Sequence, residues 1–371
     1  MKNKKINAVS LFASGGIGEF YLEDIGVEVK VANELLVDRA NFYQFLYPDS
    51  KMIAGDITDK NVYQTVINEA ISKECKLLIA TPPCQGMSVA GKMDRNDPRN
   101  TLIISAIDAI LDTDVDYALI ENVPGMLNFS ILVNGKPIKI VDYITERLVP
   151  KYNISFQVVN AADYGTPQTR KRAIVLISKN HEWEMPEKEE QITVREAIEY
   201  LPTLESEGIS DIKYHNAKKH KEEHILCLKH TPTGKTALNN EVYYPKKDGR
   251  KVRGYQTTYK RIEWDKPSPT ITMCNGAVSS QNNVHPGRKL DDGTYSDARV
   301  LTLLELFILM GLPKDPGFPD GFSDNQIRHI LGEAVPPILI KRIIGQIMDT
   351  TIVRKKKSRT KSPAQLGLFG N

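Results

Sequence analysis

The sequence predicts an α/β fold in which short buried strands end in loops that carry polar residues. Residues 76–80 (Lys-Leu-Leu-Ile-Ala) and 117–120 (Tyr-Ala-Leu-Ile) are brief apolar runs of the kind found in parallel sheets. A helical stretch at residues 100–111 separates them. A strand, a helix and a strand in this order form a βαβ unit, whose strand-end loops lie side by side at one edge of the sheet. We therefore expect both loops to face one site.

The first predicted element is an N-terminal strand that turns into a helix through a glycine-rich segment. Gly16 and Gly18 in this turn let a ligand approach the backbone closely. A second strand at residues 27–33 ends at Glu34. An acidic residue about 20 positions after a glycine-rich turn usually holds ribose hydroxyls. The glycines by themselves would fit a dinucleotide enzyme as readily.

Cys84 follows the strand at residues 76–80 and comes directly after a double proline. Pro82 and Pro83 have fixed φ angles and lack backbone donors, so the loop that leaves the strand is stiff. A thiol on such a loop suits a positioned nucleophile. Taken alone, Cys84 could equally be a buried cysteine without a function, since free cysteines are among the most buried residues.

Glu121 ends the next strand and precedes a Pro-Gly turn. The βαβ geometry brings it beside Cys84, so one substrate meets a nucleophile and an acid. Further on, Gln168, Arg170 and Arg172 follow a Gly-Thr-Pro turn and lead into another apolar strand. An isolated glutamate or a lone basic pair is more often solvated surface, but the placement of these residues after strands and turns favours a site.

In this order, these blocks resemble the DNA cytosine-5 methyltransferase family. Pro-Cys-Gln (83–85), Glu-Asn-Val-Pro-Gly (121–125) and Gln-Thr-Arg-Lys-Arg (168–172) carry a likeness that extends from Leu11 to about Ile347. It implies a Rossmann-like, S-adenosylmethionine-dependent methyltransferase sheet with a smaller, irregular target-recognition domain. It also implies a DNA (cytosine-5-)-methyltransferase of the bacterial restriction-modification type.

The family's chemistry gives each of these residues a role. Cytosine C5 is a poor nucleophile, and addition of the Cys84 thiolate to C6 of a flipped-out base lets C5 attack a sulfonium methyl group. The resemblance implies that Glu121 protonates or hydrogen-bonds N3 and that Arg172 contacts the cytosine carbonyl. Arg170 is expected to order the loop and backbone. Both arginines would help the thiol to ionise.

The methyl donor implied by the resemblance is S-adenosylmethionine. Its expected binding residues are Phe12, Gly16, Gly18, Glu34, Asp56, Ile57, Pro82, Ala334 and Val335. Two residues depart from the family pattern. Ser14 stands where Phe-x-Gly-x-Gly has its first glycine, and Glu333 replaces Asn in Gly-Asn-Ala-Val-Pro-Pro. We expect the contact at Glu333 to run through backbone atoms, or the loop to sit differently.

The middle of the chain loses the strand–helix rhythm and becomes polar, Lys-rich and punctuated by Gly and Pro. The predicted parts are a catalytic and cofactor-binding domain (1–180), a target-recognition region (181–297), a C-terminal return to the catalytic domain (298–352) and a basic, disordered tail (353–371). Basic runs at 218–221 and 246–251 would supply phosphate affinity, although a single run is usually solvated surface. The residues expected to contact DNA are Gln85, Ser88, Gln168 and Arg261.

Composition excludes several classes of protein. No segment approaches the roughly 18 apolar residues of a membrane span, and we expect no signal peptide before the first strand. The four cysteines lack paired spacing, which predicts a reducing cytoplasm, and the net charge of +3 permits nucleic-acid binding without requiring it. A His/Cys cluster has spacings that zinc accepts, but its Lys- and Glu-rich surroundings favour a solvated helix, so we predict no metal. The cluster consists of His220, His224, Cys227 and His230.

The tail suggests a partner. Gln365 to Phe369 (Gln-Leu-Gly-Leu-Phe) resembles the peptide that bacterial replication and repair proteins insert into the sliding clamp, while packing onto its own domain is the alternative. The other expected partners are double-stranded DNA and a cognate restriction endonuclease, for a monomer in the cytoplasm, associated with the nucleoid. A tRNA cytosine-5 methyltransferase and a non-catalytic DNA-binding protein of the same fold are the rival functions. A nicotinamide enzyme would leave the Pro-Cys-Gln loop unexplained.

Overall fold

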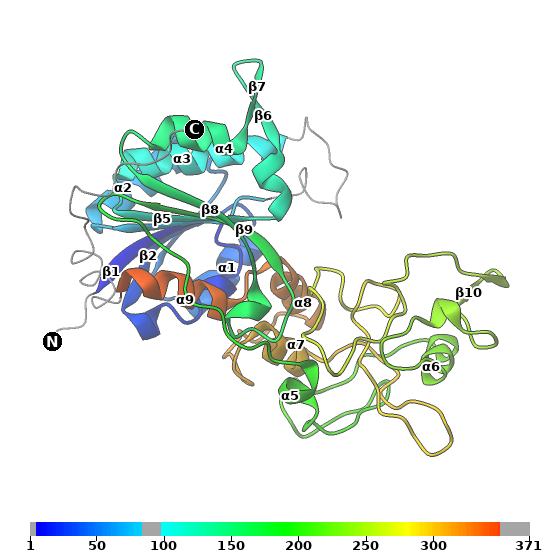
Figure 1. Ribbon diagram of the computed structural model, residues 1–371. Helices are drawn as coiled ribbons and strands as arrows, with labels where there is room; N and C mark the ends of the chain where they lie inside the picture. Colours follow the sequence, from blue (N-terminus) through cyan, green and yellow to red (C-terminus); the bar gives the residue numbers. More distant parts are fainter. Residues whose placement is uncertain (1–4, 84–97, 349–371) are drawn as a thin grey trace, which may run out of the picture.

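A seven-stranded sheet forms the centre of the larger lobe in this computed structural model, which describes residues 5–83 and 98–348 (Figure 1). The strand order is β3-β2-β1-β4-β5-β9-β8. The strands are β1 (Ile6–Leu11), β2 (Val27–Glu34), β3 (Lys51–Ala54), β4 (Leu77–Ala80), β5 (Tyr117–Asn122), β8 (Asn153–Asn160) and β9 (Lys171–Ser178). The first five run parallel, and β9 lies antiparallel between β5 and β8. The predicted Rossmann-like α/β sheet is confirmed.

Helices cover both faces of this sheet (Figure 1). One face packs on α2 (Lys60–Ser72), α3 (Leu102–Thr113) and α4 (Ile140–Leu148), and the other on α9 (Pro337–Met348). A further helix, α1 (Val37–Leu46), follows β2. Strands β4 and β5 are buried at every position, which explains the apolar runs at residues 77–80 and 117–120. The chain thus returns to the sheet through α9 after a long excursion.

That excursion forms most of a second lobe with few regular elements (Figure 1). Its helices and strands are α5 (Val194–Ile198), α6 (Glu222–Lys229), β10 (Lys246–Lys247), β11 (Arg250–Lys251), α7 (Leu303–Met310) and α8 (Asp324–Glu333). One apolar cluster joins α5, α7 and α8, and another surrounds Tyr259 and Val284. A small hairpin, β6 (Ser130–Val133) with β7 (Lys136–Lys139), projects from the larger lobe (Figure 1). The boundaries proposed for the recognition region remain a prediction.

Buried arginines hold the irregular backbone of the second lobe together. Irregular segments leave carbonyl groups without sheet partners, and a buried carbonyl needs a donor. The side chain of Arg261 is fully buried, and its guanidinium donates to the carbonyls of Leu228, His285 and Ser296, among others. Because this side chain does not reach the surface, our expectation that Arg261 contacts DNA is wrong. Its role is to support the lobe.

The described part of the chain contains no helix long and apolar enough to cross a membrane. Within the same residues, no group of three or more His, Cys, Asp or Glu side chains could hold a metal ion. The members of the His/Cys cluster have separate environments: His220 Nε2 accepts the backbone N–H of Val300, and His230 stacks on Tyr243.

Candidate active site

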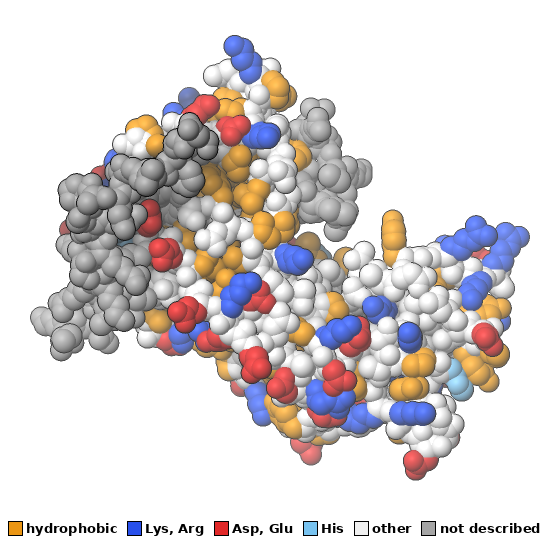
Figure 2. Space-filling model, viewed as in Figure 1, with side chains coloured by type: hydrophobic (Ala, Val, Ile, Leu, Met, Phe, Trp, Pro, Cys, Tyr) orange, Lys and Arg blue, Asp and Glu red, His pale blue; other side chains and the backbone are white. Residues whose placement is uncertain are grey.

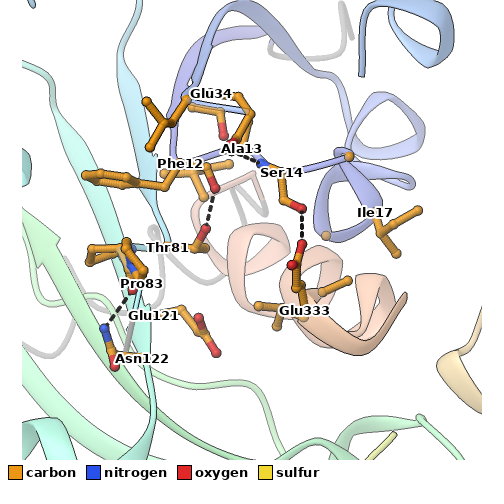
Figure 3. A pocket seen from close by; sticks show the side chains of 18 of the residues that line it. Phe12, Ala13, Ser14, Ile17, Glu34, Thr81, Pro83, Glu121, Asn122 and Glu333 are labelled. Carbon is orange, nitrogen blue, oxygen red and sulfur yellow. Dashed lines mark hydrogen bonds between the residues drawn. The ribbon is translucent and has the colours of Figure 1, made fainter. Parts of the chain in front are cut away.

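A cavity of about 470 Å³ opens where the parallel strands end; we call it the strand-end cavity (Figure 3). Its walls come from the loops after β1, β2, β3 and β4, the end of β5, and the loop after α8. Open α/β sheets bind ligands at this edge. Eight of the expected cofactor-binding residues line the cavity: Phe12, Gly18, Glu34, Asp56, Ile57, Pro82, Ala334 and Val335.

Gly16, the ninth expected residue, supports the turn from outside the cavity wall. Its φ of 75° lies in the left-handed region, and a Cβ here would come within 2.4 Å of the Tyr47 ring. The Tyr47 hydroxyl also donates to the Gly16 carbonyl at 2.7 Å. The sequence located this glycine correctly in the turn, but its closest neighbours are tyrosines from the end of α1 and the residue after it.

Two acidic residues that were expected to bind the cofactor, Glu34 and Asp56, lie at strand ends. Glu34 accepts the backbone N–H groups of Ser14 and Leu36, each at 2.8 Å. Burial raises the pKa of Glu34 above its ordinary value, and these two hydrogen bonds oppose that rise. Asp56 accepts both the N–H and the hydroxyl of Thr58 through Oδ1. Both carboxyl groups are therefore fixed before any ligand binds.

Hydrogen bonds tie the ends of three central strands together (Figure 3). The side-chain amide of Asn122 donates to the Pro82 carbonyl at 3.0 Å, and the Thr81 hydroxyl donates to the Phe12 carbonyl at 2.9 Å. The loops after β4 and β5 are thus side by side, as the βαβ reading predicted. No sequence motif gave Asn122 a role, although it directly follows Glu121. Cys84, Gln85 and Ser88 lie outside the described residues.

Glu121 and Arg172 form an ion pair on the cavity wall. Arg172 Nε lies 2.6 Å from Glu121 Oε1, and the two side chains are 14% and 8% exposed. The pairing follows from the sheet register, because Glu121 lies opposite Ile174 on the antiparallel neighbour β9. Arg172 is two residues from Ile174 and so projects from the same face of β9. Glu121 and Arg172, which were both expected to contact the cytosine, therefore meet here.

Arg170 and Gln168 lie deeper and bind backbone. The Arg170 guanidinium donates to the carbonyls of Ile271, Gly332 and Glu333 at 2.9 to 3.2 Å, which agrees with its expected role in ordering the backbone. Gln168 is fully buried; its amide nitrogen donates to Met310 Sδ, and its oxygen accepts the N–H of Ile271. The expected contact of Gln168 with DNA is therefore wrong, because its polar atoms serve the junction between the lobes.

Glu19 is a buried acid on the cavity wall that the sequence analysis did not select. The Tyr43 hydroxyl donates to its carboxyl group at 2.5 Å. Burial raises the pKa of Glu19 to about 7, and hydrogen bonds from Ser10 and Tyr43 limit the rise. Its position at the end of the glycine-rich turn was the available signal, but the sequence could not reveal its burial.

The two residues that depart from the family pattern meet in space. The Ser14 hydroxyl donates to Glu333 Oε2 at 3.1 Å (Figure 3). Arg39 on α1 completes this group, since its Nε donates to the same oxygen at 3.0 Å. No motif pointed to Arg39, which lies far from Glu333 in the sequence.

Comparisons with known proteins cover nearly all of the chain. The family model for C-5 cytosine-specific DNA methylases matches residues 6–349. The Type II methyltransferase M1.HgaI of Avibacterium volantium is 47% identical over 353 residues, which are 93% of this chain and 99% of that protein. The Type II methyltransferase M1.HphI of Haemophilus parahaemolyticus is 27% identical over 350 residues, or 92% and 86% of the two chains.

Solved structures show the same fold at low sequence identity. An E. coli prophage protein described as a DNA modification methyltransferase has a TM-score of 0.69 at 18% identity and covers 94% of this chain and all of its own. The DNMT2 protein of Spodoptera frugiperda has a TM-score of 0.59 at 16% identity, with 93% and 100% of the two chains covered. These two likenesses extend through both lobes.

Proposed function

The chain belongs to the C-5 cytosine-specific DNA methylase family, and we propose that it methylates C5 of a cytosine within a specific DNA sequence, as part of a type II restriction-modification system. The observation that carries this proposal is the Glu121–Arg172 pair, which shares a cavity with Glu34 and with the first residues of the Cys84 loop. Addition to a cytosine ring requires a nucleophile, an acid and a positioned cation. This edge of the sheet brings together the acid, the cation and the loop that carries the nucleophile.

S-adenosylmethionine is the proposed methyl donor, and the residues of the strand-end cavity suit it. The cofactor supplies a methyl group on a sulfonium sulfur. Glu34 can accept hydrogen bonds from a ribose diol, and Asp56 can accept one from an adenine amino group. Phe12, Ile57 and Val335 offer apolar surface between these polar groups. Sites for small molecules combine an apolar lining with a few fixed polar groups in this way.

Cys84 is the proposed nucleophile. The described residues that precede it, Pro82 and Pro83, both line the cavity, and Asn122 fixes the Pro82 carbonyl. Addition of the Cys84 thiolate forms an S–C6 bond and makes C5 electron-rich enough to take the methyl group. Solvent then takes the original C5 proton, the S–C6 bond breaks and the thiolate is released. The loop acts by holding the sulfur in attack geometry.

Glu121 and Arg172 are proposed to act on the opposite edge of the ring. The addition displaces electron density toward N3, and the Glu121 carboxyl group stabilises it by donating a hydrogen bond or a proton to N3. Arg172 holds the carboxyl group before the base arrives and then contacts the cytosine carbonyl, so the pair opens to admit the base. These atoms lie inside the stack of a duplex, and we therefore propose that the cytosine is flipped out.

Contact with DNA is proposed for the β10–β11 hairpin, which we call the basic hairpin (Lys246 to Lys251). It carries three lysines and one arginine among six exposed residues, and Figure 2 shows Lys and Arg side chains gathered over β10. Lys251 Nζ lies 4.5 Å from the centre of the Tyr244 ring, which orients that ammonium group. Phosphates are the natural partner of such a cluster. Gln85 and Ser88 remain proposed DNA contacts.

Further partners are proposed from the sequence. A cognate endonuclease would accompany a type II enzyme, and Gln365 to Phe369 would dock on the sliding clamp of the cytoplasmic replication machinery. The enzyme itself would act as a monomer on nucleoid DNA. A pulldown with purified clamp tests the docking, and equal recovery of the full chain and of a chain lacking Gln365 to Phe369 would contradict it.

The proposed reaction is tested by methyl transfer from radiolabelled S-adenosylmethionine to unmethylated genomic DNA and, in parallel, to tRNA. Bisulfite sequencing of the products locates the modified base. We expect label in DNA, at C5, within one short sequence. Label in tRNA alone would replace the DNA assignment with the RNA alternative. Label in neither, with S-adenosylmethionine bound, would favour a non-catalytic DNA-binding protein.

A further inference from the structure

Ser14 has an unusual backbone conformation for a residue with a side chain. Its φ of 46° lies in the left-handed region, where Cβ meets backbone atoms and where glycine is favoured. Such a conformation persists only when the surrounding structure holds it in place. A serine at this point of the turn therefore needs neighbours that fix it.

Those neighbours are two glutamates, one on each side of Ser14. The Ser14 N–H donates to Glu34 Oε2 at 2.8 Å, and its hydroxyl donates to Glu333 Oε2 at 3.1 Å (Figure 3). Glu34 ends β2, whereas Glu333 ends α8. One residue in the turn after β1 thus joins two opposite parts of the cavity wall.

Arg39 holds Glu333 from behind. Its Nε and Nη2 donate to the two carboxylate oxygens at 3.0 and 3.2 Å, a bidentate arrangement that is among the stronger side-chain pairings. The Arg39 side chain is 10% exposed and that of Glu333 is 25% exposed. Ser14 and Glu333 line the strand-end cavity, while Arg39 is absent from its lining. The arginine therefore acts on the cavity through Glu333.

The backbone of Glu333 is fixed as well. Arg170 Nη2 donates to its carbonyl at 3.2 Å and to the preceding carbonyl, that of Gly332, at 3.1 Å. Fixing both the backbone and the carboxylate leaves Glu333 little freedom to move. Ala334 and Val335, which follow it, also line the cavity. A shift of Glu333 would consequently displace that part of the wall.

We propose that Ser14, Glu333 and Arg39 act as one positioning unit that fixes one wall of the strand-end cavity. Within this unit, the serine and the glutamate depend on each other. The unit deepens the proposed function, since it rests on S-adenosylmethionine binding in this cavity. The two departures from the family pattern then form a matched pair. The Ser14 hydroxyl donates a hydrogen bond to the Glu333 carboxylate, and the carboxylate holds Ser14 in its disfavoured conformation. Neither residue works well without the other.

Interdependence is measured with a double-mutant cycle. The affinities for S-adenosylmethionine and S-adenosylhomocysteine are determined by calorimetry for the wild type, Ser14→Ala, Glu333→Ala and the double variant. Each single change removes a hydrogen bond to a charged group, and we expect affinity to fall about tenfold. The affinity of the double variant should lie within about twofold of that of Glu333→Ala. Losses that multiply in the double variant would overturn the proposal.

Ser14→Gly separates the hydroxyl from the backbone strain. Glycine accepts the left-handed conformation without cost, so a loss of affinity close to that of Ser14→Ala assigns the effect to the hydroxyl. Affinity equal to the wild type would show that the hydrogen bond contributes nothing. Glu69→Ala is the matched control, because Glu69 pairs with Lys51 at the surface of α2, and it should bind like the wild type.

Further readouts distinguish positioning from folding. KM for S-adenosylmethionine should rise in the single variants, while kcat and the affinity of the protein alone for DNA stay within about twofold. A fall in melting temperature with a parallel loss of DNA binding would mean a purely structural role and would overturn the proposal. If the wild type binds neither S-adenosylmethionine nor S-adenosylhomocysteine, the proposed function itself fails, and that result is distinct from variants that bind like the wild type.

Discussion

Arg172 pairs with Glu121 across two antiparallel strands, with Nε 2.6 Å from Oε1. The two residues are 51 positions apart in sequence, and the register of β5 against β9 brings them together. A carboxyl group held in this way keeps one orientation until a substrate competes for the arginine. The pair therefore positions the acid and also has to be broken when the base binds.

Replacing Glu121 should slow chemistry far more than it weakens binding. Glu121→Gln keeps the size of the side chain and an acceptor for Arg172 but cannot transfer a proton. We expect kcat to fall about 100-fold or more, with DNA affinity within about threefold. Single-turnover methylation and a binding assay give the two numbers. Asp112→Asn, which alters a surface acid paired with Tyr63, is the control and should leave both unchanged.

Cys84→Ser should abolish methyl transfer and retain DNA binding, because a serine hydroxyl is a much weaker nucleophile than a thiolate. DNA that contains 5-fluorocytosine gives a direct measurement, since the fluorine cannot leave as a proton does and the adduct accumulates. The wild type and Cys274→Ser, whose thiol is exposed, should form a complex stable on a denaturing gel. A complex with Cys84→Ser would contradict the assignment of the nucleophile.

Glu19 should make stability depend on pH. Its pKa is raised by burial to about 7, so the folded protein binds a proton here that the unfolded chain releases above about pH 4.5. This contribution to stability is complete below pH 4.5 and is lost as the pH rises toward 7. Glu19→Gln removes the dependence, and we expect it to be more stable than the wild type at pH 8 by about 3 kcal/mol. Urea unfolding of both proteins at pH 5 and pH 8 measures the difference, and an equal gap at the two pH values would contradict the prediction.

Gly332 should tolerate no side chain. A Cβ at this position would lie 2.3 Å from the backbone nitrogen of Met273, and backbone cannot move aside as a flexible side chain can. We expect Gly332→Ala to destabilise the protein by about 2 to 4 kcal/mol. Gly345→Ala is the matched control in α9, because a Cβ there would meet nothing within 4 Å beyond its chain neighbours and the nearby backbone of its own helix, and it should be neutral or slightly stabilising. Denaturant unfolding compares the two.

Loss of charge from the basic hairpin should weaken DNA binding without changing sequence preference. Lys246→Ala combined with Lys247→Ala removes two exposed ammonium groups. If both contact phosphates, the slope of log affinity against log salt falls by about 2 units. Binding titrations from low to high salt measure it, with Lys60→Ala and Lys73→Ala at the ends of α2 as the control pair. An unchanged slope would place the DNA elsewhere.

Much of the larger lobe could be predicted from sequence because parallel strands have local signatures. The apolar runs before Pro82 and Glu121 are buried strands, and the βαβ rule brought their loops together. Arg170 was expected to order backbone, and it does. These inferences needed only short segments and the geometry of a sheet.

The sequence was less informative where contacts depend on distant residues. Gln168 and Arg261 are polar residues of kinds that often contact DNA, and only the irregular packing of the second lobe reveals that they are buried. Arg39 gave no signal because its partner is 294 residues away. Ser14 and Glu333 were each recognised as departures, but their contact could not be read from either position alone.

The strip from Ser268 to Met273 has a consequence for exchanging the proposed recognition region between related enzymes. Ser268 pairs with Gln168 in a parallel bridge, Arg170 binds the Ile271 carbonyl, and Met273 lies against Gly332. A graft cut at residues 181 and 297 would replace this strip with that of another enzyme. It would thereby break the contacts with Gln168, Arg170 and Gly332 of the host. A graft that ends before Ser268 would keep them, so the exchangeable cassette is shorter than the change in composition along the chain suggests.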